Sequence, residues 1–158
     1  MQAFLASWFD SLEGGDTPDA VCSSRWRELI QQAANGELDD WQSTPPGMLA
    51  LILLFTQVPK RLGLPSPERW HFKARALCIS GIRRGFDTQL DLCGRHGFYA
   101  PLFHSQLEED KLLLSRLLGG MRALAADQDP QLCRLAQWQG WWQQAGLESA
   151  VAGCQSNV

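Results

Sequence analysis

Residues 43–55 read STPPGMLALILLF, and this stretch decides the fold. Thr44 can cap a helix, and Pro45 suits its first position because proline has a preset φ and no amide hydrogen to leave unpaired. The residues from Met48 to Phe55 are apolar on every helical face. A helix that is apolar all round is buried among neighbours. A membrane span needs about 20 apolar residues, so this shorter run predicts a central core helix and no membrane association.

Helical spacing also dominates on both sides of this segment. Apolar residues recur three or four positions apart, and no stretch alternates long enough to form a strand. We therefore expect an all-α single domain over residues 1–152, built from about seven helices in antiparallel pairs, with a loosely ordered tail at 153–158. The helices are expected near residues 4–12, 18–34, 45–58, 68–86, 87–99, 107–124 and 130–152.

The helix near residues 18–34 has a clear start signal in the sequence. Thr17 is expected to be its N-cap, with Pro18 in the first turn. Its inward face is expected to carry Val21, Trp26, Leu29, Ile30 and Ala33.

Composition limits the class of protein. The 158 residues have a mass of 17.7 kDa, 20% charged residues and a net charge of −3, which fits one globular domain and excludes disordered and collagen-like classes. Residues 1–10 carry no basic region, so we expect no signal peptide and a cytoplasmic protein. The five cysteines show no Cys-x-x-Cys spacing, which favours buried, reduced thiols. A reactive thiolate at Cys78 or Cys93 is the alternative, because both lie in a basic segment.

Charge is spread unevenly along the chain. Residues 1–40 hold two arginines against eight acidic residues, a net charge of −6, whereas residues 59–96 hold eight basic residues against three acidic ones, a net charge of +5. One explanation is that these charges lie on solvated helix faces and pair across helices, where each ion pair contributes little to stability. Alternatively, some arginines line an anion site, since the planar guanidinium binds carboxylate or phosphate through two hydrogen bonds. No nucleic-acid-reading motif is present, so we expect no nucleic-acid partner.

Two ordered blocks of sequence resemble a known bacterial family. The first comprises Gly36–Trp41, Thr44–Leu54 and Gln57–Lys60, and the second is Arg95–Ser105. Together they make the chain, from about Phe4 to Ala125, similar to the proteins of domain of unknown function 924. The resemblance implies an all-α fold with tetratricopeptide-repeat-like helix pairs, and it implies no settled activity.

The chain departs from the family pattern at several positions. Thr56 stands where the family usually has Asp, and Phe103 and Gln106 stand where it usually has Glu. The family's Arg/His-rich C-terminal stretch is replaced by Trp138–Trp142. These exchanges put any carboxylate-dependent function of the family in doubt and favour a more aromatic ligand.

Polar residues in the two blocks form the predicted site. His96 and Tyr99 share a helical face, and with His104 they are the candidate catalytic residues, because histidine can act as a general base and tyrosine can donate a hydrogen bond. The candidate ligand-binding residues are Trp41, Gln57, Arg61 and Arg95. The simpler interpretation is that all of these side chains serve the fold, and no carboxylate partner for the histidines is evident.

The sequence therefore predicts a protein that binds a small polar or anionic molecule in a cleft between helices, with a role as a small biosynthetic enzyme as one form of this function. A protein-interaction module with an open helical groove is the first alternative. A homodimer through Trp138, Trp141 and Trp142 is the second. Two histidines eight residues apart are a poor metal site, and no glycine-rich phosphate loop is present, so neither a metal nor a cofactor is expected.

Overall fold

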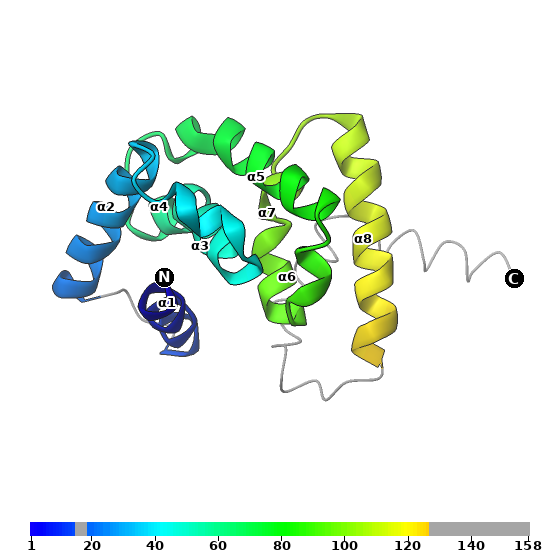
Figure 1. Cartoon of the computed structure of the whole chain (residues 1–158), viewed down its shortest axis with the longest axis horizontal. Coiled ribbons are helices and arrows are strands. Elements are labelled where there is room, and N and C mark those ends of the chain that lie inside the picture. The colour runs from blue at the N-terminus through cyan, green and yellow to red at the C-terminus, as the bar shows by residue number, and fades with distance from the viewer. Residues whose placement is uncertain (15–18, 127–158) are drawn as a thin grey trace, which may run out of the picture. The chain divides into compact units, whose positions relative to one another are not determined.

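The computed structural model describes residues 1–14 and 19–126, and all regular elements within them are helical (Figure 1). This confirms the predicted all-α class for the described residues, while the repeat-like pairing of helices stays a prediction. The elements, with the short 3₁₀ helices written as η, are α1 (Gln2–Gly14), α2 (Ala20–Ala34), η1 (Asp39–Ser43), α3 (Pro45–Phe55), α4 (Gln57–Arg61), η2 (Pro67–Trp70), α5 (His71–Arg83), η3 (Asp87–Gln89), α6 (Leu92–Phe98), α7 (Ala100–Phe103) and α8 (Glu108–Ala126).

The predicted central helix is α3. Its N-cap is Thr44, whose side chain accepts a hydrogen bond from the Gly47 amide at 3.2 Å. It packs against α1, α2, α4, α5 and α6 (Figure 1), and every residue from Gly47 to Phe55 is buried. The burial of all its faces confirms the prediction that this helix forms the core.

The expected helix over 45–58 is divided in two at Thr56. Pro59 has no amide hydrogen to offer the carbonyl of Phe55, so the helical ladder is interrupted there. Thr56 adopts φ −120° and ψ −74°, and its hydroxyl donates a hydrogen bond to the Ile52 carbonyl at 2.7 Å. Thr56 thus supplies a buried hydroxyl that bonds to the carbonyl of its own helix.

Two details predicted for α2 are wrong. Asp19, and not Thr17, is the N-cap, because its carboxylate accepts a hydrogen bond from the Cys22 amide at 2.7 Å. Val21 is 82% exposed instead of buried. The buried stripe of Trp26, Leu29, Ile30 and Ala33 extends back by helical spacing to Cys22, which leaves Val21 on the outer side.

The expected helices over 68–86 and 87–99 are shorter in the structure. Asp91 caps α6 by accepting a hydrogen bond from the Gly94 amide at 2.7 Å, so this helix begins after Asp91 and not at Asp87. Before α5, the chain forms η2. Near the C-terminal end of α5, Gly81 allows a close approach: a Cβ atom there would lie 2.3 Å from Cζ of Phe98 and 2.7 Å from Sδ of Met48.

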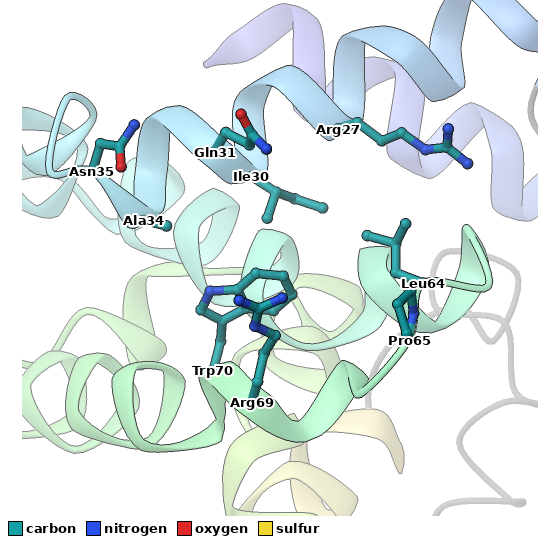
Figure 2. Close-up of a pocket in the computed structure, with 9 residues that line it drawn as sticks. All are labelled: Arg27, Ile30, Gln31, Ala34, Asn35, Leu64, Pro65, Arg69 and Trp70. Atoms are coloured by element: carbon teal, nitrogen blue, oxygen red, sulfur yellow. The ribbon is translucent and has the colours of Figure 1, made fainter.

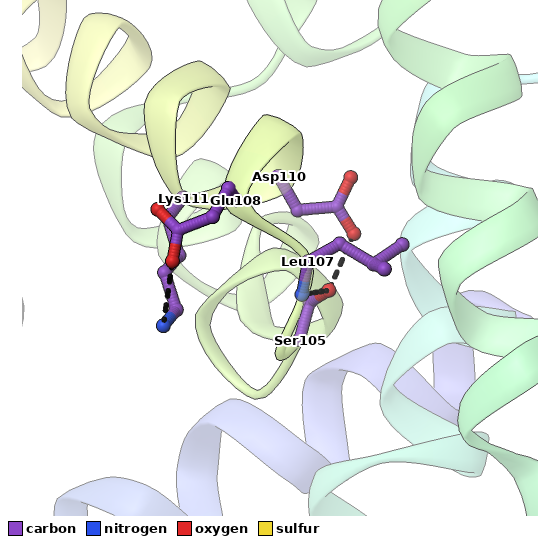
Figure 3. A network of polar contacts seen from close by, with 5 residues as sticks. All are labelled: Ser105, Leu107, Glu108, Asp110 and Lys111. Carbon is purple, nitrogen blue, oxygen red and sulfur yellow. Dashed lines mark hydrogen bonds and ion pairs between the residues drawn. The ribbon is translucent and has the colours of Figure 1, made fainter.

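The chain divides into two compact units, residues 1–101 and 102–158. In the second unit, α8 confirms the helix predicted near 107–124, and Figure 3 shows how it begins. The Ser105 hydroxyl accepts a hydrogen bond from the Leu107 amide at 3.2 Å and donates one to the buried Asp110 carboxylate at 2.5 Å. Lys111 pairs with Glu108 on the exposed side at 3.6 Å.

Several predictions lie outside the described residues, namely the helix near 130–152, its tryptophans and the tail at 153–158. The predicted extent of a single domain also stays a prediction. No helix in the described ranges has both the length and the apolar composition needed to cross a bilayer.

Candidate functional site

A cavity of about 440 Å³ lies in the first unit, between α2 and the segment that leads into η2 (Figure 2). This volume falls within the usual range for small-molecule sites, about 300–1,000 Å³. Nine residues line the cavity: Arg27, Ile30, Gln31, Ala34, Asn35, Leu64, Pro65, Arg69 and Trp70. They include two arginines and two amides but no carboxylate.

The α2 wall of the cavity follows from helical spacing. Arg27, Ile30, Gln31 and Ala34 are separated by three or four residues and therefore share one face. Ile30 also belongs to the buried stripe of α2 and is 2% exposed, so it forms the apolar floor. Arg27 and Gln31 are exposed, so the polar side chains of this wall lie on the solvent side of the buried Ile30.

The opposite wall is an irregular segment with fixed geometry. Pro65 and Pro67 each restrict φ. Ser66 between them has φ 50° and ψ 58°, a left-handed conformation that is uncommon for residues other than glycine. Trp70 lies at the end of η2, with its ring centroid 6.3 Å from that of the buried Phe55. This ring contact anchors the wall to α3.

The polar groups of the cavity are largely uncommitted. Within the described residues, the side chains of Arg27, Gln31 and Asn35 form no hydrogen bond or ion pair. The guanidinium carbon of Arg69 lies 4.7 Å from the centroid of the Trp70 ring. Figure 2 shows Arg27 extending from α2 beside Leu64, whereas Arg69 rises from the opposite wall next to Trp70. The cavity therefore offers positive charge from both walls above an apolar floor.

The predicted ligand-binding residue Arg61 contacts α1. Its Nη2 donates a hydrogen bond to the Ser11 carbonyl at 2.8 Å, and its guanidinium carbon lies 5.6 Å from the Trp8 ring centroid. Gln57, the first residue of α4, is half-buried. Trp41 is half-buried in η1, and its carbonyl comes so close to the first turn of α3 that a Cβ at Gly47 would lie 2.1 Å away.

Arg95 and Tyr99 meet around η3. Arg95 donates hydrogen bonds to the carbonyls of Leu90 at 3.1 Å and Thr88 at 3.0 Å. The Tyr99 hydroxyl donates one to Oδ2 of Asp87 at 2.5 Å, and both residues are buried. Burial, together with this hydrogen bond to a carboxylate, raises the pKa of Tyr99 above its usual range.

The two predicted catalytic histidines lie in different surroundings. Burial lowers the pKa of His96 to about 4, so its imidazole is neutral at pH 7 and weakly basic. His104 belongs to the second unit and is exposed, with its ring centroid 5.3 Å from that of Phe103. The structure thus joins Arg95 and Tyr99 at η3 and places Arg61 at α1, and none of the seven predicted residues is among the nine that line the cavity.

Sequence reasoning missed two features. Asp87 is the carboxylate partner of Tyr99, although it lies twelve residues away in the chain. The five polar and aromatic cavity residues, Arg27, Gln31, Asn35, Arg69 and Trp70, were also not predicted. The four-residue spacing of Arg27 and Gln31 indicates that they share one helical face. No sequence pattern, however, predicts that this face lies opposite a segment almost 40 residues later in the chain.

The cysteines and candidate metal ligands add little to the site. Cys78 is buried in α5, and burial followed by the charge of Asp19 raises the pKa of the half-buried Cys22. The environment of Cys22 therefore disfavours a thiolate. Among the described residues, no three His, Cys, Asp or Glu side chains are grouped as a metal site.

Known proteins resemble the chain as follows. The sequence model of the family "Bacterial protein of unknown function (DUF924)" matches residues 2–148. A solved structure of a protein of unknown function from Agrobacterium tumefaciens has a similar fold, with a TM-score of 0.71 and 20% sequence identity, over 96% of this chain and 83% of that chain. At this identity, the likeness shows the fold alone. No curated protein matches the chain.

Proposed function

The chain belongs to the DUF924 family of bacterial proteins of unknown function, and from this premise we propose that it binds a small anionic molecule in the cavity between α2 and η2. One observation carries the proposal: Arg27 and Arg69 reach the cavity from opposite walls, and no lining residue is acidic. Charge-assisted hydrogen bonds from arginine to an anion are about twice as strong as neutral ones.

The amide side chains support the same function. Gln31 and Asn35 can each donate and accept hydrogen bonds, and both face the cavity without a partner within the described residues. Donors and acceptors of this kind fix the orientation of a ligand, while the apolar floor provides the area that excludes water.

Titration of the isotope-labelled full chain with acetate, benzoate and inorganic phosphate tests this proposal by nuclear magnetic resonance. The side-chain amide signals of Gln31 and Asn35 report directly on the cavity. We expect at least one of these anions to shift both signals in a saturable manner. In the double variant Arg27→Gln/Arg69→Gln, we expect the affinity to fall at least tenfold, which corresponds to about 1.4 kcal/mol.

The double variant Arg25→Gln/Arg83→Gln is the matched control. It removes the same charge from exposed positions that do not line the cavity. If both double variants bind the anions equally well, or if no anion shifts the two amide signals, the proposal is wrong.

The sequence also suggested a small enzyme, and the contacts at η3 suggest where to look for one. A buried tyrosine bonded to a buried carboxylate, with Arg95 nearby, is a grouping of titratable residues that active sites often contain. We keep His96 and Tyr99 of the first unit as proposed catalytic residues, and His104 of the second unit as a separate candidate. Their role requires a substrate, which the ligand-binding experiment would first have to identify.

A further inference from the structure

We infer that the ligand of this cavity is a carboxylate with a compact apolar body, held in one orientation, and not a phosphate. The inference rests on the proposed function of the cavity and specifies its ligand class. It depends on the apolar lining, on the direction of α2 and on the placement of the two arginines.

The apolar lining sets the first requirement. Leu64, Pro65 and Trp70 provide an aliphatic and aromatic surface, whereas Ile30 is 2% exposed and adds little to it. Because Trp70 packs against Phe55, its ring is held in place before any ligand arrives. A small inorganic anion would leave this surface in contact with water, whereas an apolar body would cover it and gain about 25 cal/mol per Å².

The direction of α2 sets the second requirement. Ala34 is the last residue of this helix and Asn35 is its C-cap, so one end of the cavity adjoins the helix C-terminus. Carbonyl groups at that end carry a partial negative charge, which disfavours a nearby anion, and a dianion most of all. Lys73 donates a hydrogen bond to the Ala34 carbonyl at 3.1 Å and offsets part of this charge.

Arg27 lies away from that end. It precedes Ala34 by seven residues, or about 10 Å along the helix axis. A single carboxylate at Arg27 therefore avoids the helix C-terminus. The body of the ligand then extends past Leu64 towards the Arg69 and Trp70 side chains, where the guanidinium lies over the indole ring.

Calorimetric titration with four related compounds tests this ligand class. They are 3-phenylpropionate, its neutral amide, acetate and phenyl phosphate. We expect 3-phenylpropionate to bind at least tenfold more tightly than each of the other three. The amide lacks the charge, acetate lacks the body, and phenyl phosphate carries a second negative charge that the single guanidinium of Arg27 does not neutralise.

Two single-residue variants test separately which side chain binds the charged part of the ligand and which binds the apolar part. Arg27→Gln should abolish the difference between the acid and its amide, because that difference comes from the charge. Leu64→Ala should weaken the acid and the amide by the same factor and leave acetate unchanged. Arg25→Gln, on the same helix but outside the cavity, should change nothing.

The outcomes separate the inference from the proposed function. If phenyl phosphate binds more tightly than the carboxylate and its binding requires Arg27, the inference is wrong and anion binding stands. If acetate binds as tightly as 3-phenylpropionate, the ligand does not need an apolar body, so the inference is wrong and anion binding again stands. If the amide binds as tightly as the acid, or if no compound binds, both are wrong.

Discussion

The hydroxyl of Tyr99 lies 2.5 Å from the Asp87 carboxylate, and the two residues are 1% and 3% exposed. This hydrogen bond joins the end of α6 to η3 within the first unit. A carboxylate at such depth is costly unless a donor satisfies it. The pair therefore explains why a short irregular segment can be buried at this place.

Replacement of Tyr99 by Phe removes the hydroxyl and keeps the ring. We expect Tyr99→Phe to lower the free energy of unfolding by about 1–3 kcal/mol, because the Asp87 carboxylate is left buried without this donor. Urea denaturation followed by circular dichroism measures the change. A double-mutant cycle with Asp87→Asn should give a coupling energy above about 0.5 kcal/mol, and additive effects would show that the bond is unimportant.

Gly81 tests the close packing of α3, α5 and α6. A methyl group there would overlap Phe98 and Met48, so we expect Gly81→Ala to destabilise the protein by about 1–3 kcal/mol. Gly120→Ala is the matched control, since a Cβ at this position of α8 meets no atom within 4 Å. Alanine favours a helix more than glycine does, so the control should stabilise the protein by up to about 1 kcal/mol. Equal effects in thermal denaturation would contradict this interpretation.

Burial of His96 predicts a dependence of stability on pH. Its pKa in the folded chain is about 4, compared with 6.5 for the unperturbed group. The unfolded chain therefore binds more protons below pH 6.5. The contribution of His96 to stability is complete above pH 6.5 and is lost as the pH falls towards 4, by at most about 3 kcal/mol.

The variant His96→Gln isolates this effect. The difference in unfolding free energy between the wild-type protein and the variant should change between pH 6.5 and 4 and be constant from pH 7 to 8. Urea titrations at half-unit pH intervals measure it. A difference that stays constant across the acid range would mean that His96 takes up its proton in the folded chain as readily as in the unfolded one.

The contacts of Arg61 predict that this side chain stabilises α1 against local opening. Its side chain bonds to the Ser11 carbonyl and lies against Trp8, so it connects α4 with the first helix. We expect Arg61→Gln to accelerate amide hydrogen exchange in α1 at least tenfold and to leave α3 almost unchanged, because local opening needs less free energy than global unfolding. Arg25→Gln controls for the loss of charge. Uniform acceleration in all helices would indicate a global role instead.

The sequence predicted the core because burial leaves a local signature there. The apolar run from Met48 to Phe55 has no polar face, so only a central position in the fold removes all of its apolar side chains from water. Helix ends were predicted less well, since several residues could serve as caps. Asp19 and Asp91 took this role in the structure, and their side chains compete with neighbours of similar chemistry.

The candidate site could not be predicted in the same way. The sequence identifies Tyr99 as a candidate, but its hydrogen-bond partner Asp87 is set by the turn before α6 and by no periodic pattern. The cavity joins Arg27 to Arg69 across more than 40 residues. Such a meeting depends on the packing of α2 against α3, which places one face of α2 opposite the segment that follows α4.

The Pro65-Ser66-Pro67 turn has a consequence for kinetics. Pro65 and Pro67 restrict φ, and Ser66 adopts a left-handed backbone conformation, so this wall has few alternative conformations. Little conformational entropy is therefore lost when a ligand binds. The cavity should then behave as a rigid receptor. Association would be a single bimolecular step, linear in ligand concentration, and differences in affinity between related compounds would arise from how fast they leave.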